Sequence, residues 1–288
     1  MMLFAPPDRL LFGVSGVPDS SPKPSSEAGI VRSRELGLGC MEMAMVQKVT
    51  ITEPTAAKVR AAAEREGIFL SIHAPYYINL NSKDPQKLAD SQKRVLAAAR
   101  AGDWTGARNI VLHIAFYHDN TPAETTAIIR DNLLPIMETL EAEGSQAVLR
   151  PETMGKLSQW GDLDETLDLC IAVPGLQPCI DFAHLHARHG RDNTYDEFLA
   201  ILDRVGDRLG ERALRDLHIH ISGIAYGAKG EQHHLTFADA DFNYRDCLRA
   251  LRDRNCAGLV IGESPARELD VIFLKNVWQE VLDERDLG

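Results

Sequence analysis

The sequence predicts an α/β fold of the (β/α)8 barrel type, in which eight parallel strands alternate with eight helices. Three observations lead to this expectation: short apolar runs alternate with longer helical segments, the chain has 288 residues, and several apolar runs end in a histidine or a carboxylate. Such alternation implies parallel strands joined by crossover helices. Eight units in about 250 to 300 residues complete one barrel, so we expect a single domain over residues 1–288.

The expected strands are short runs rich in apolar and β-branched residues, each bounded by turn-forming or polar residues. They cover Leu10–Val14, Cys40–Met43, Ile68–His73, Asn109–His113, Val148–Glu152, Cys179–Asp181, His218–His220 and Leu259–Glu263. Most are too short and too regularly spaced for buried helices, which favours strands.

The expected helices carry apolar residues at spacings of three and four, as amphipathic helices do. They cover residues 27–36, Glu53–Gly67, Asp84–Ala101, Ala123–Glu143, Asp162–Val173, Tyr195–Leu209, Tyr244–Arg254 and Leu269–Glu284. The alternative is a doubly wound open sheet, which predicts a glycine-rich phosphate turn after the first strand. Gly13–Pro18 lacks the third glycine and the helix start of that turn, so we favour the barrel.

Composition is that of a soluble globular enzyme, with 44% hydrophobic and 25% charged residues. The apolar runs are too short to span a bilayer, and Met1–Asp8 does not resemble a secretory signal, so no membrane partner is expected. The five cysteines form no CxxC pair, which favours a cytoplasmic location. A net charge of -11 argues against a broad basic face, so nucleic-acid binding would need a local positive patch or bound cations.

Six expected strands end in a residue type that binds metals. They are His73, His113, Glu152, Asp181, His220 and Glu263. Because side chains alternate across a strand, these last inward residues meet at the C-terminal mouth of the barrel. One alone would be a hydrogen-bonded core histidine or a helix N-cap. Six together are costly to bury unless they bind cations, and mixed imidazole and carboxylate ligands suit Zn²⁺ first, then Mn²⁺ or Fe²⁺.

Further candidates lie in the segments that follow two of these strands. His184 comes three residues after Asp181, so both side chains can point at one site. We interpret His186 and His189 as solvated loop histidines. A glycine-interrupted loop after the His220 strand carries four more polar residues that could fold over the mouth: Glu231, Gln232, His233 and His234.

Three motifs carry a resemblance to a known family: His73–Leu80, Cys179–His184 and Gly262–Pro265. With them the chain resembles the endonuclease IV family of apurinic/apyrimidinic endonucleases, which have a xylose isomerase-like (TIM) barrel, and the resemblance runs from the first strand to the last. It implies a metal-dependent hydrolase that cleaves the phosphodiester on the 5′ side of abasic sites in base-excision DNA repair. The partner would be double-stranded DNA containing abasic sites, and we expect a monomer.

The resemblance also implies a set of ligands. His73, His113 and Glu152 would hold one zinc, and Glu152 would bridge to a second zinc held by Asp181, His220 and Glu263. His184 would bind a third ion together with residues from the glycine-interrupted loop after the His220 strand. Two registers are open: Glu231 with His233, or Gln232 with His234. We prefer the second, in which an amide replaces a carboxylate and the third ion is weak or absent.

Phosphodiester hydrolysis at neutral pH needs a hydroxide and shielding of the phosphate charge, and clustered zinc ions supply both. The expected catalytic residues are Glu152, beside a bridging hydroxide, and Glu263. Tyr76 and Tyr77 fall where the family has side chains that penetrate the duplex beside the abasic gap, so they are the expected DNA-binding residues.

The alternative function is a metal-dependent sugar isomerase or epimerase on the same barrel, with Glu152, Asp181, His220 and Glu263 binding a polyol. Net acidity favours the sugar enzyme, whereas Tyr76, Tyr77 and His184 favour DNA. Ser222–Gly223 after His220 and Arg150–Pro151 before Glu152 depart from the common family pattern and indicate a divergent branch.

Overall fold

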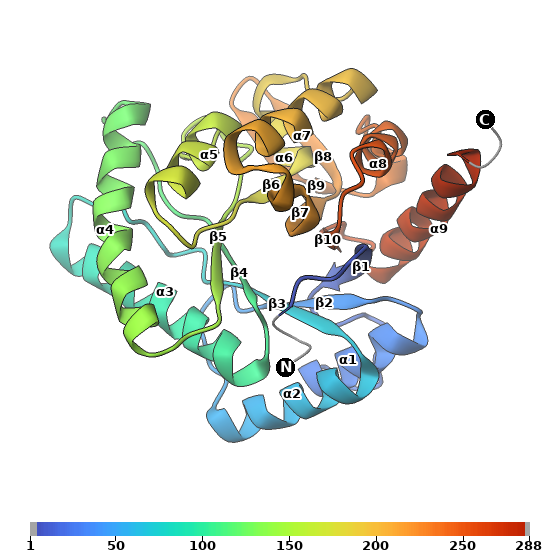
Figure 1. Ribbon diagram of the computed structural model, residues 1–288, viewed down its shortest axis with the longest axis horizontal. Coiled ribbons are helices and arrows are strands. Elements are labelled where there is room, and N and C mark those ends of the chain that lie inside the picture. Colours follow the sequence, from blue (N-terminus) through green and yellow to red (C-terminus); the bar gives the residue numbers. More distant parts are fainter. Residues whose placement is uncertain (1–4, 286–288) are drawn as a thin grey trace.

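Eight parallel strands form the barrel in the computed structural model, which describes residues 5–285 (Figure 1). They are β1 (Leu10–Ser15), β2 (Cys40–Ala44), β3 (Phe69–His73), β4 (Asn109–Leu112), β5 (Val148–Pro151), β6 (Cys179–Asp181), β7 (Leu217–Ile221) and β10 (Gly258–Gly262). Their order is β5-β4-β3-β2-β1-β10-β7-β6. A parallel bridge between Glu152 and Cys179 joins the two ends of this sheet, so the predicted (β/α)8 barrel is confirmed.

Helices surround the strands on the outside (Figure 1). In residues 5–285 they are α1 (Ser26–Glu35), α2 (Glu53–Glu66), α3 (Pro85–Thr105), α4 (Pro122–Ala142), α5 (Leu163–Ala172), α6 (Phe182–His189), α7 (Tyr195–Leu209), α8 (Tyr244–Asp253) and α9 (Glu268–Arg285). Within the described range, no helix combines the length and apolar character needed to cross a membrane.

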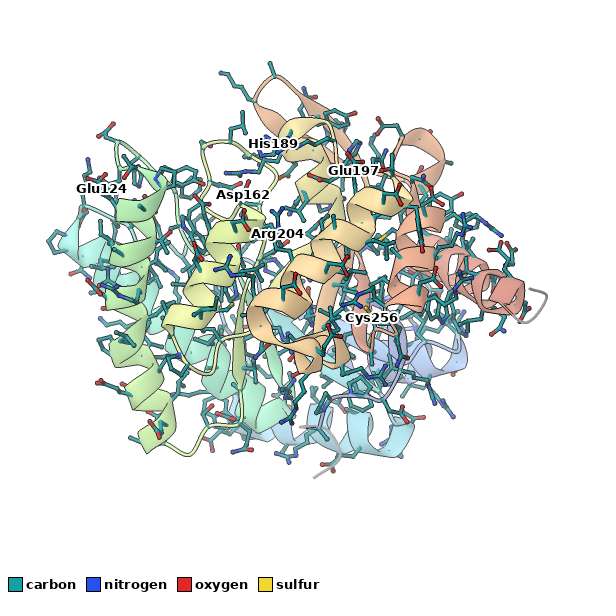
Figure 2. All side chains as sticks on the ribbon, turned by 45° about the horizontal axis from the view of Figure 1, so that its top comes forward. Glu124, Asp162, His189, Glu197, Arg204 and Cys256 are labelled. Atoms are coloured by element: carbon teal, nitrogen blue, oxygen red, sulfur yellow. The ribbon has the colours of Figure 1, made fainter. Side chains whose placement is uncertain are left out.

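Local sequence signals explain where several helices begin. Capping boxes start α4, where Thr121 pairs with Glu124, and α7, where Thr194 pairs with Glu197. Asp162 caps α5 and also lies 3.3 Å from the last residue of α6, His189 (Figure 2). These caps satisfy backbone N–H groups at the ends of the helices, where no partner exists within the helix.

Two elements differ from the expected pattern of eight strands and eight helices. The segment after β6, which we expected to be a loop, is the additional helix α6, because Asp181 Oδ1 accepts a hydrogen bond from the His184 backbone N–H at 2.7 Å. His186 is therefore buried, with its Nε2 3.1 Å from Asp241 Oδ1, and the interpretation of it as a solvated histidine is wrong. His189 is exposed but helical.

The second unexpected element is an antiparallel hairpin of β8 (Gly223–Gly227) and β9 (Gly230–Leu235). It lies between β7 and α8 in the chain and is joined to the loop after β5 by a bridge between Lys156 and Gly230. The hairpin thereby reaches the C-terminal mouth of the barrel.

Apolar side chains fill the space between strands and helices, where Ile219 and Ile221 of β7 are fully buried. The interior of the barrel is divided. One part is an apolar cluster of Cys40, Leu259 and Ile261, with Leu11 and Phe69 packed against it. The other is a buried polar layer of Glu42, Ser71, Asn109, Arg150 and His218. Side chains along β7 therefore alternate, with His218 in the interior layer and Ile219 and Ile221 packed toward the helices.

A cluster of charged side chains lies at the end of this polar layer opposite the mouth. The fully buried Arg150 donates from Nη2 to Asp216 Oδ1 at 2.8 Å, and Arg108 donates to both Asp216 oxygens at 2.7 and 2.6 Å. Burial raises the pKa of Asp216, but Arg150 and Arg108 outweigh it and lower that pKa. Asp216 is thus the counter-charge of a guanidinium that has no access to solvent.

We expect Asp216→Ala to destabilise the protein by about 3–5 kcal/mol, because it leaves the Arg150 charge buried without a carboxylate. The matched control is Asp164→Ala, which removes an exposed pair with Arg204 (N···O 3.1 Å) and should cost less than about 1 kcal/mol. Urea unfolding of both variants at equal metal content measures the difference. Similar losses in the two variants would contradict this role of Asp216.

Candidate metal centre

The first group of candidate ligands consists of His73, His113 and Glu152, whose ligand atoms lie within 4.8 Å of one another. Glu152 Oε2 is 3.4 Å from His73 Nε2 and 3.0 Å from His113 Nε2. His73 Nδ1 lies 2.9 Å from the carbonyl oxygen of Ala74, which can only accept, so Nδ1 carries the proton. The lone pair of His73 Nε2 therefore faces the group, as a metal ligand requires.

The second group shares Glu152 and adds Asp181, His220 and Glu263, again within 4.8 Å. His220 Nδ1 is 3.2 Å from Glu152 Oε1 and 3.5 Å from Glu263 Oε2. The two oxygens of Glu152 thus face different groups, Oε2 the first and Oε1 the second. This is the arrangement that a bridging carboxylate needs.

The third group consists of Asp181, His184 and His234. His184 Nε2 lies 3.4 Å from His234 Nε2 and 3.5 Å from Glu231 Oε2. His184 Nδ1 is 3.0 Å from the carbonyl oxygen of Thr153 and so holds the proton. The Nε2 lone pair is consequently directed at the hairpin residues.

The hairpin differs from both registers that the sequence left open. A β-bulge places Tyr226 opposite Glu231 and Ala225 opposite His233, so Gln232 is an extra residue on β9. Because a bulge reverses the alternation of faces, Glu231 and His234 both turn toward His184, whereas Gln232 and His233 are exposed. The expected replacement of the carboxylate by an amide is wrong, and His233 lies outside the group.

A glycine permits this close approach of the hairpin. A Cβ atom at Gly155 would lie 2.7 Å from Glu231 Cβ and 3.2 Å from His184 Cδ2. Any larger residue at position 155 would push Glu231 away from His184. The third group therefore depends on the loop after β5 as well as on the hairpin.

The donor atoms of the first two groups fit divalent cations. Two of these buried atoms, Glu152 Oε2 and Asp181 Oδ2, have no hydrogen-bond partner among the described residues. Buried polar atoms without partners are rare in folded proteins and often indicate an ion or water. Burying Glu152 and Asp181 beside Glu263 also requires positive charge nearby.

Without bound ions, protons on histidines supply that positive charge. Burial lowers the pKa of His73, but the hydrogen bond and the charge of Glu152 outweigh it and raise this pKa to about 9. Burial likewise lowers the pKa of His184, and Asp181 and Glu152 raise it to about 10. Metal binding must displace these protons, so it competes with protonation.

We expect the metal-free protein to lose stability as the pH rises from about 6.5 to about 10. The folded-state pKa of His73 and His184 lies above the ordinary value of 6.5, so their protonation stabilises the fold below pH 6.5. This contribution disappears as the pH rises through about 9 and 10. Thermal unfolding in a chelator across this range measures it, and saturating Zn²⁺ should remove the decline.

His184→Gln should flatten this pH profile because it removes one of the histidines whose pKa is raised. The control is His118→Gln, which changes an exposed histidine that is hydrogen-bonded to Asn79. An unchanged profile in His184→Gln would show that this histidine does not carry the effect.

The hairpin geometry also predicts how neighbouring histidines differ. His234→Ala should lower the affinity for one bound ion, because it removes a donor 3.4 Å from His184 Nε2. His233→Ala, one residue away and exposed, should leave metal content unchanged. Metal analysis after graded chelation compares the two proteins. Loss of an ion only in His233→Ala would contradict the bulged register.

Tyr76 and Tyr77 lie in the loop after β3, at the edge of the C-terminal mouth of the barrel. Tyr76 is half exposed and stacks on His113, with ring centroids 4.9 Å apart and an interplanar angle of 25°. Tyr77 is 66% exposed. Their loop is held by backbone hydrogen bonds from Tyr76 N–H to Val46 and from Leu80 N–H to Ile114. Both tyrosines are therefore carried by a fixed segment, and the Tyr76 ring lies beside the first group.

A pocket of about 420 Å³ opens between Tyr76 and the ligand groups. Beyond Tyr76 and the ligands it is lined by Phe116, Met154, Lys156 and Gln159. Gln159 is almost fully buried, and its Oε1 has no hydrogen-bond partner in the part of the chain that the structure describes. The pocket thus offers an aromatic face, a cation and an unpaired amide beside the candidate ligands.

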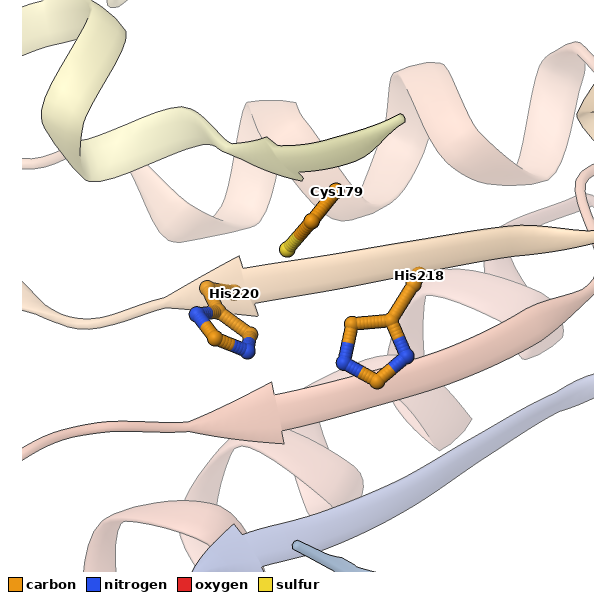
Figure 3. A group of neighbouring side chains, drawn as sticks. All are labelled: Cys179, His218 and His220. Atoms are coloured by element: carbon orange, nitrogen blue, oxygen red, sulfur yellow. The ribbon is translucent and has the colours of Figure 1, made fainter. Parts of the chain in front are cut away.

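Sequence reasoning did not single out one buried carboxylate, Glu42 of β2. It lies beneath the mouth among Ser71, His218 and His220. An acidic residue inside a short apolar strand, at a position whose side chain faces inward, was the available signal. Cys179, His218 and His220 also form a compact group in this layer (Figure 3).

The comparisons with known proteins agree with this architecture. The model of the family described as xylose isomerase-like TIM barrel matches residues 30–284, and this chain belongs to that family. An uncharacterized protein of Methanocaldococcus jannaschii is 41% identical over 273 residues, covering 94% of this chain and 98% of the relative. A probable endonuclease 4 of Streptomyces avermitilis is 28% identical over 180 residues, which span 60% of this chain and 58% of that protein.

Solved structures with this fold include two different kinds of enzyme. Endonuclease IV from Thermus thermophilus has a TM-score of 0.72 and 19% identity, with 96% of this chain and 99% of that chain covered. A D-tagatose 3-epimerase-like protein has a TM-score of 0.73 and 17% identity, with 96% and 100% covered. At such identities these likenesses show the fold alone.

Proposed function

We propose that this protein is a zinc-dependent endonuclease that hydrolyses the phosphodiester on the 5′ side of abasic sites in duplex DNA. The observation that carries the proposal is the presence of three adjoining ligand groups. A sugar epimerase of the kind considered above needs only the group of Glu152, Asp181, His220 and Glu263. The first and third groups add His73, His113, His184 and His234. The partial likeness to probable endonuclease 4 proteins points in the same direction.

Several residues at the mouth would contribute to hydrolysis, each in a different way. Bound divalent ions supply a water of lowered pKa and shield the charge of the phosphate. Glu152 would serve as a ligand in both the first and the second group, because its two oxygens face different groups. Glu263, at the end of β10, would close the second group and lie against the substrate in the pocket. No side chain needs to act as the nucleophile.

The rim of the mouth has features that suit a DNA duplex with a missing base. Tyr76 and Tyr77 would fill the gap and stack on neighbouring bases, which aromatic side chains do with little sequence preference. Lys156 lines the pocket, and Lys48 and Lys229 are exposed on loops at the same end of the barrel. These cations and the ions of the site would offset the net charge of -11 where phosphates approach.

The second candidate is a metal-dependent sugar isomerase or epimerase. One observation favours it: the pocket of about 420 Å³ has the size of a small-molecule site and is lined by Glu263, one of the four ligands that such an enzyme needs. Gln159 could then bind a sugar hydroxyl. This interpretation leaves the exposed Tyr77 and the third ligand group without a use.

The test is to incubate zinc-loaded protein with a duplex carrying one abasic site and, in parallel, with a panel of ketoses. We expect incision on the 5′ side of the site and no sugar conversion. Glu152→Gln should reduce incision by several orders of magnitude, because it removes a charged ligand shared by two groups. Denaturing gels follow the incision.

The control variant is Glu64→Gln, which changes an exposed carboxylate on α2 and should leave incision unaltered. An undamaged duplex of the same sequence should stay intact. An intact abasic duplex together with conversion of a ketose would reject the endonuclease and support the sugar enzyme.

A further inference from the structure

Glu42 is fully buried directly beneath the second ligand group. Its Oε2 accepts hydrogen bonds from Ser71 Oγ at 2.8 Å and from His218 Nε2 at 3.1 Å. Its Oε1 lies 3.2 Å from His220 Nε2, and among residues 5–285 neither of these two atoms has a hydrogen-bond partner. One oxygen is therefore committed to two donors, and the other faces His220 alone.

The directions of these hydrogen bonds follow from their neighbours. Asn109 Oδ1 accepts from Arg108 Nη1 at 3.2 Å, so the amide nitrogen of Asn109 is the atom that faces His218 Nδ1, 3.1 Å away. That nitrogen can only donate, so His218 Nδ1 accepts and Nε2 carries the proton given to Glu42. His218 is thereby fixed as a donor.

The hydrogen bonds of His218 also indicate the role of the group shown in Figure 3. Cys179, His218 and His220 lie close enough to hold an ion. However, both nitrogens of His218 are already used in hydrogen bonds, and burial raises the pKa of the Cys179 thiol, which keeps it protonated. The group therefore supports the site above it and is not a further ion site.

We propose that Glu42 is a positioning residue that holds His220 in the tautomer protonated on Nε2. The Nδ1 lone pair then faces Glu152 Oε1 and Glu263 Oε2, at 3.2 and 3.5 Å, where an ion would be bound. A carboxylate that accepts from the far nitrogen of a ligating histidine fixes its ring and tautomer and increases its basicity. This role is the same whether the substrate is DNA or a sugar.

An isosteric substitution makes the proposal testable. In Glu42→Gln the atom at the Oε2 position must remain an oxygen, because Ser71 and His218 both donate to it. The amide N–H group then faces His220 Nε2 and forces that nitrogen to accept. The His220 proton moves to Nδ1, the atom that should bind the ion. Glu42→Ala removes the same charge without imposing this tautomer, since water can enter and accept from Nε2.

The experiment is a Zn²⁺ titration of metal-free protein against a competing chelator. We expect the Glu42→Gln protein to bind one ion about 10- to 100-fold more weakly than the unaltered protein does. It should also bind this ion more weakly than the Glu42→Ala protein does. Ser71→Ala, which removes one donor to Oε2 but leaves His218 and His220 in contact with Glu42, should bind zinc as the unaltered protein does. Thermal unfolding verifies that each variant is folded.

Two outcomes of the titration would overturn the proposal. Wild-type zinc affinity in Glu42→Gln would show that Glu42 does not control His220. Equal losses in Glu42→Gln and Glu42→Ala would show that only the charge of Glu42 matters.

A second measurement needs no variant. In the ¹⁵N NMR spectrum of the zinc-loaded, unaltered protein, we expect His220 to show a protonated Nε2 and a metal-bound Nδ1. The opposite assignment would reject the proposal even if a Glu42 variant fails to fold.

Discussion

The position of Glu152 is the constraint on which both the fold and the site depend. Its backbone forms the bridge to Cys179 that joins β5 to β6 and closes the barrel. Its side chain lies between His113 of the first ligand group and His220 of the second. Closure of the barrel and assembly of the site therefore depend on each other, because separating β5 from β6 would also separate Glu152 from Asp181.

The second constraint is the charge balance inside the barrel. Glu42, Glu152 and Asp181 are fully buried, and their charges must be met by protons on histidines or by cations. At the other end of the polar layer, Arg150 and Asp216 balance each other without help from the mouth. Ions that bind only the folded site would stabilise the protein by mass action, so its stability would then depend on metal concentration as well as on packing.

The sequence was sufficient to predict the barrel and the ends of its strands because both follow from short-range periodicity. Alternation along β7 places His218 and His220 on the inner face, and the same rule places His73 and Glu152 at the mouth. The role of Glu42 could not be derived in this way, since it depends on a partner 176 residues away on another strand. The bulge could not be predicted from the sequence either, because it depends on one inserted residue, Gln232, that reverses which side chains face the site.

The sign of the electric field at the mouth bears on which substrate the barrel accepts. Glu152, Asp181, Glu231 and Glu263 gather at one end of a chain whose net charge is -11, and protons on the neighbouring histidines offset only part of their charge. A metal-free mouth would therefore repel a phosphate backbone. Bound divalent cations are the largest local charges in such a site and would reverse that repulsion. Binding of DNA, and not only its cleavage, would then require loaded ions. A neutral sugar meets no such repulsion, and an exposed Tyr77 outside the pocket adds nothing to its binding. The same carboxylates that make the site costly to fold would therefore make binding of a polyanionic substrate depend on how much metal the protein holds.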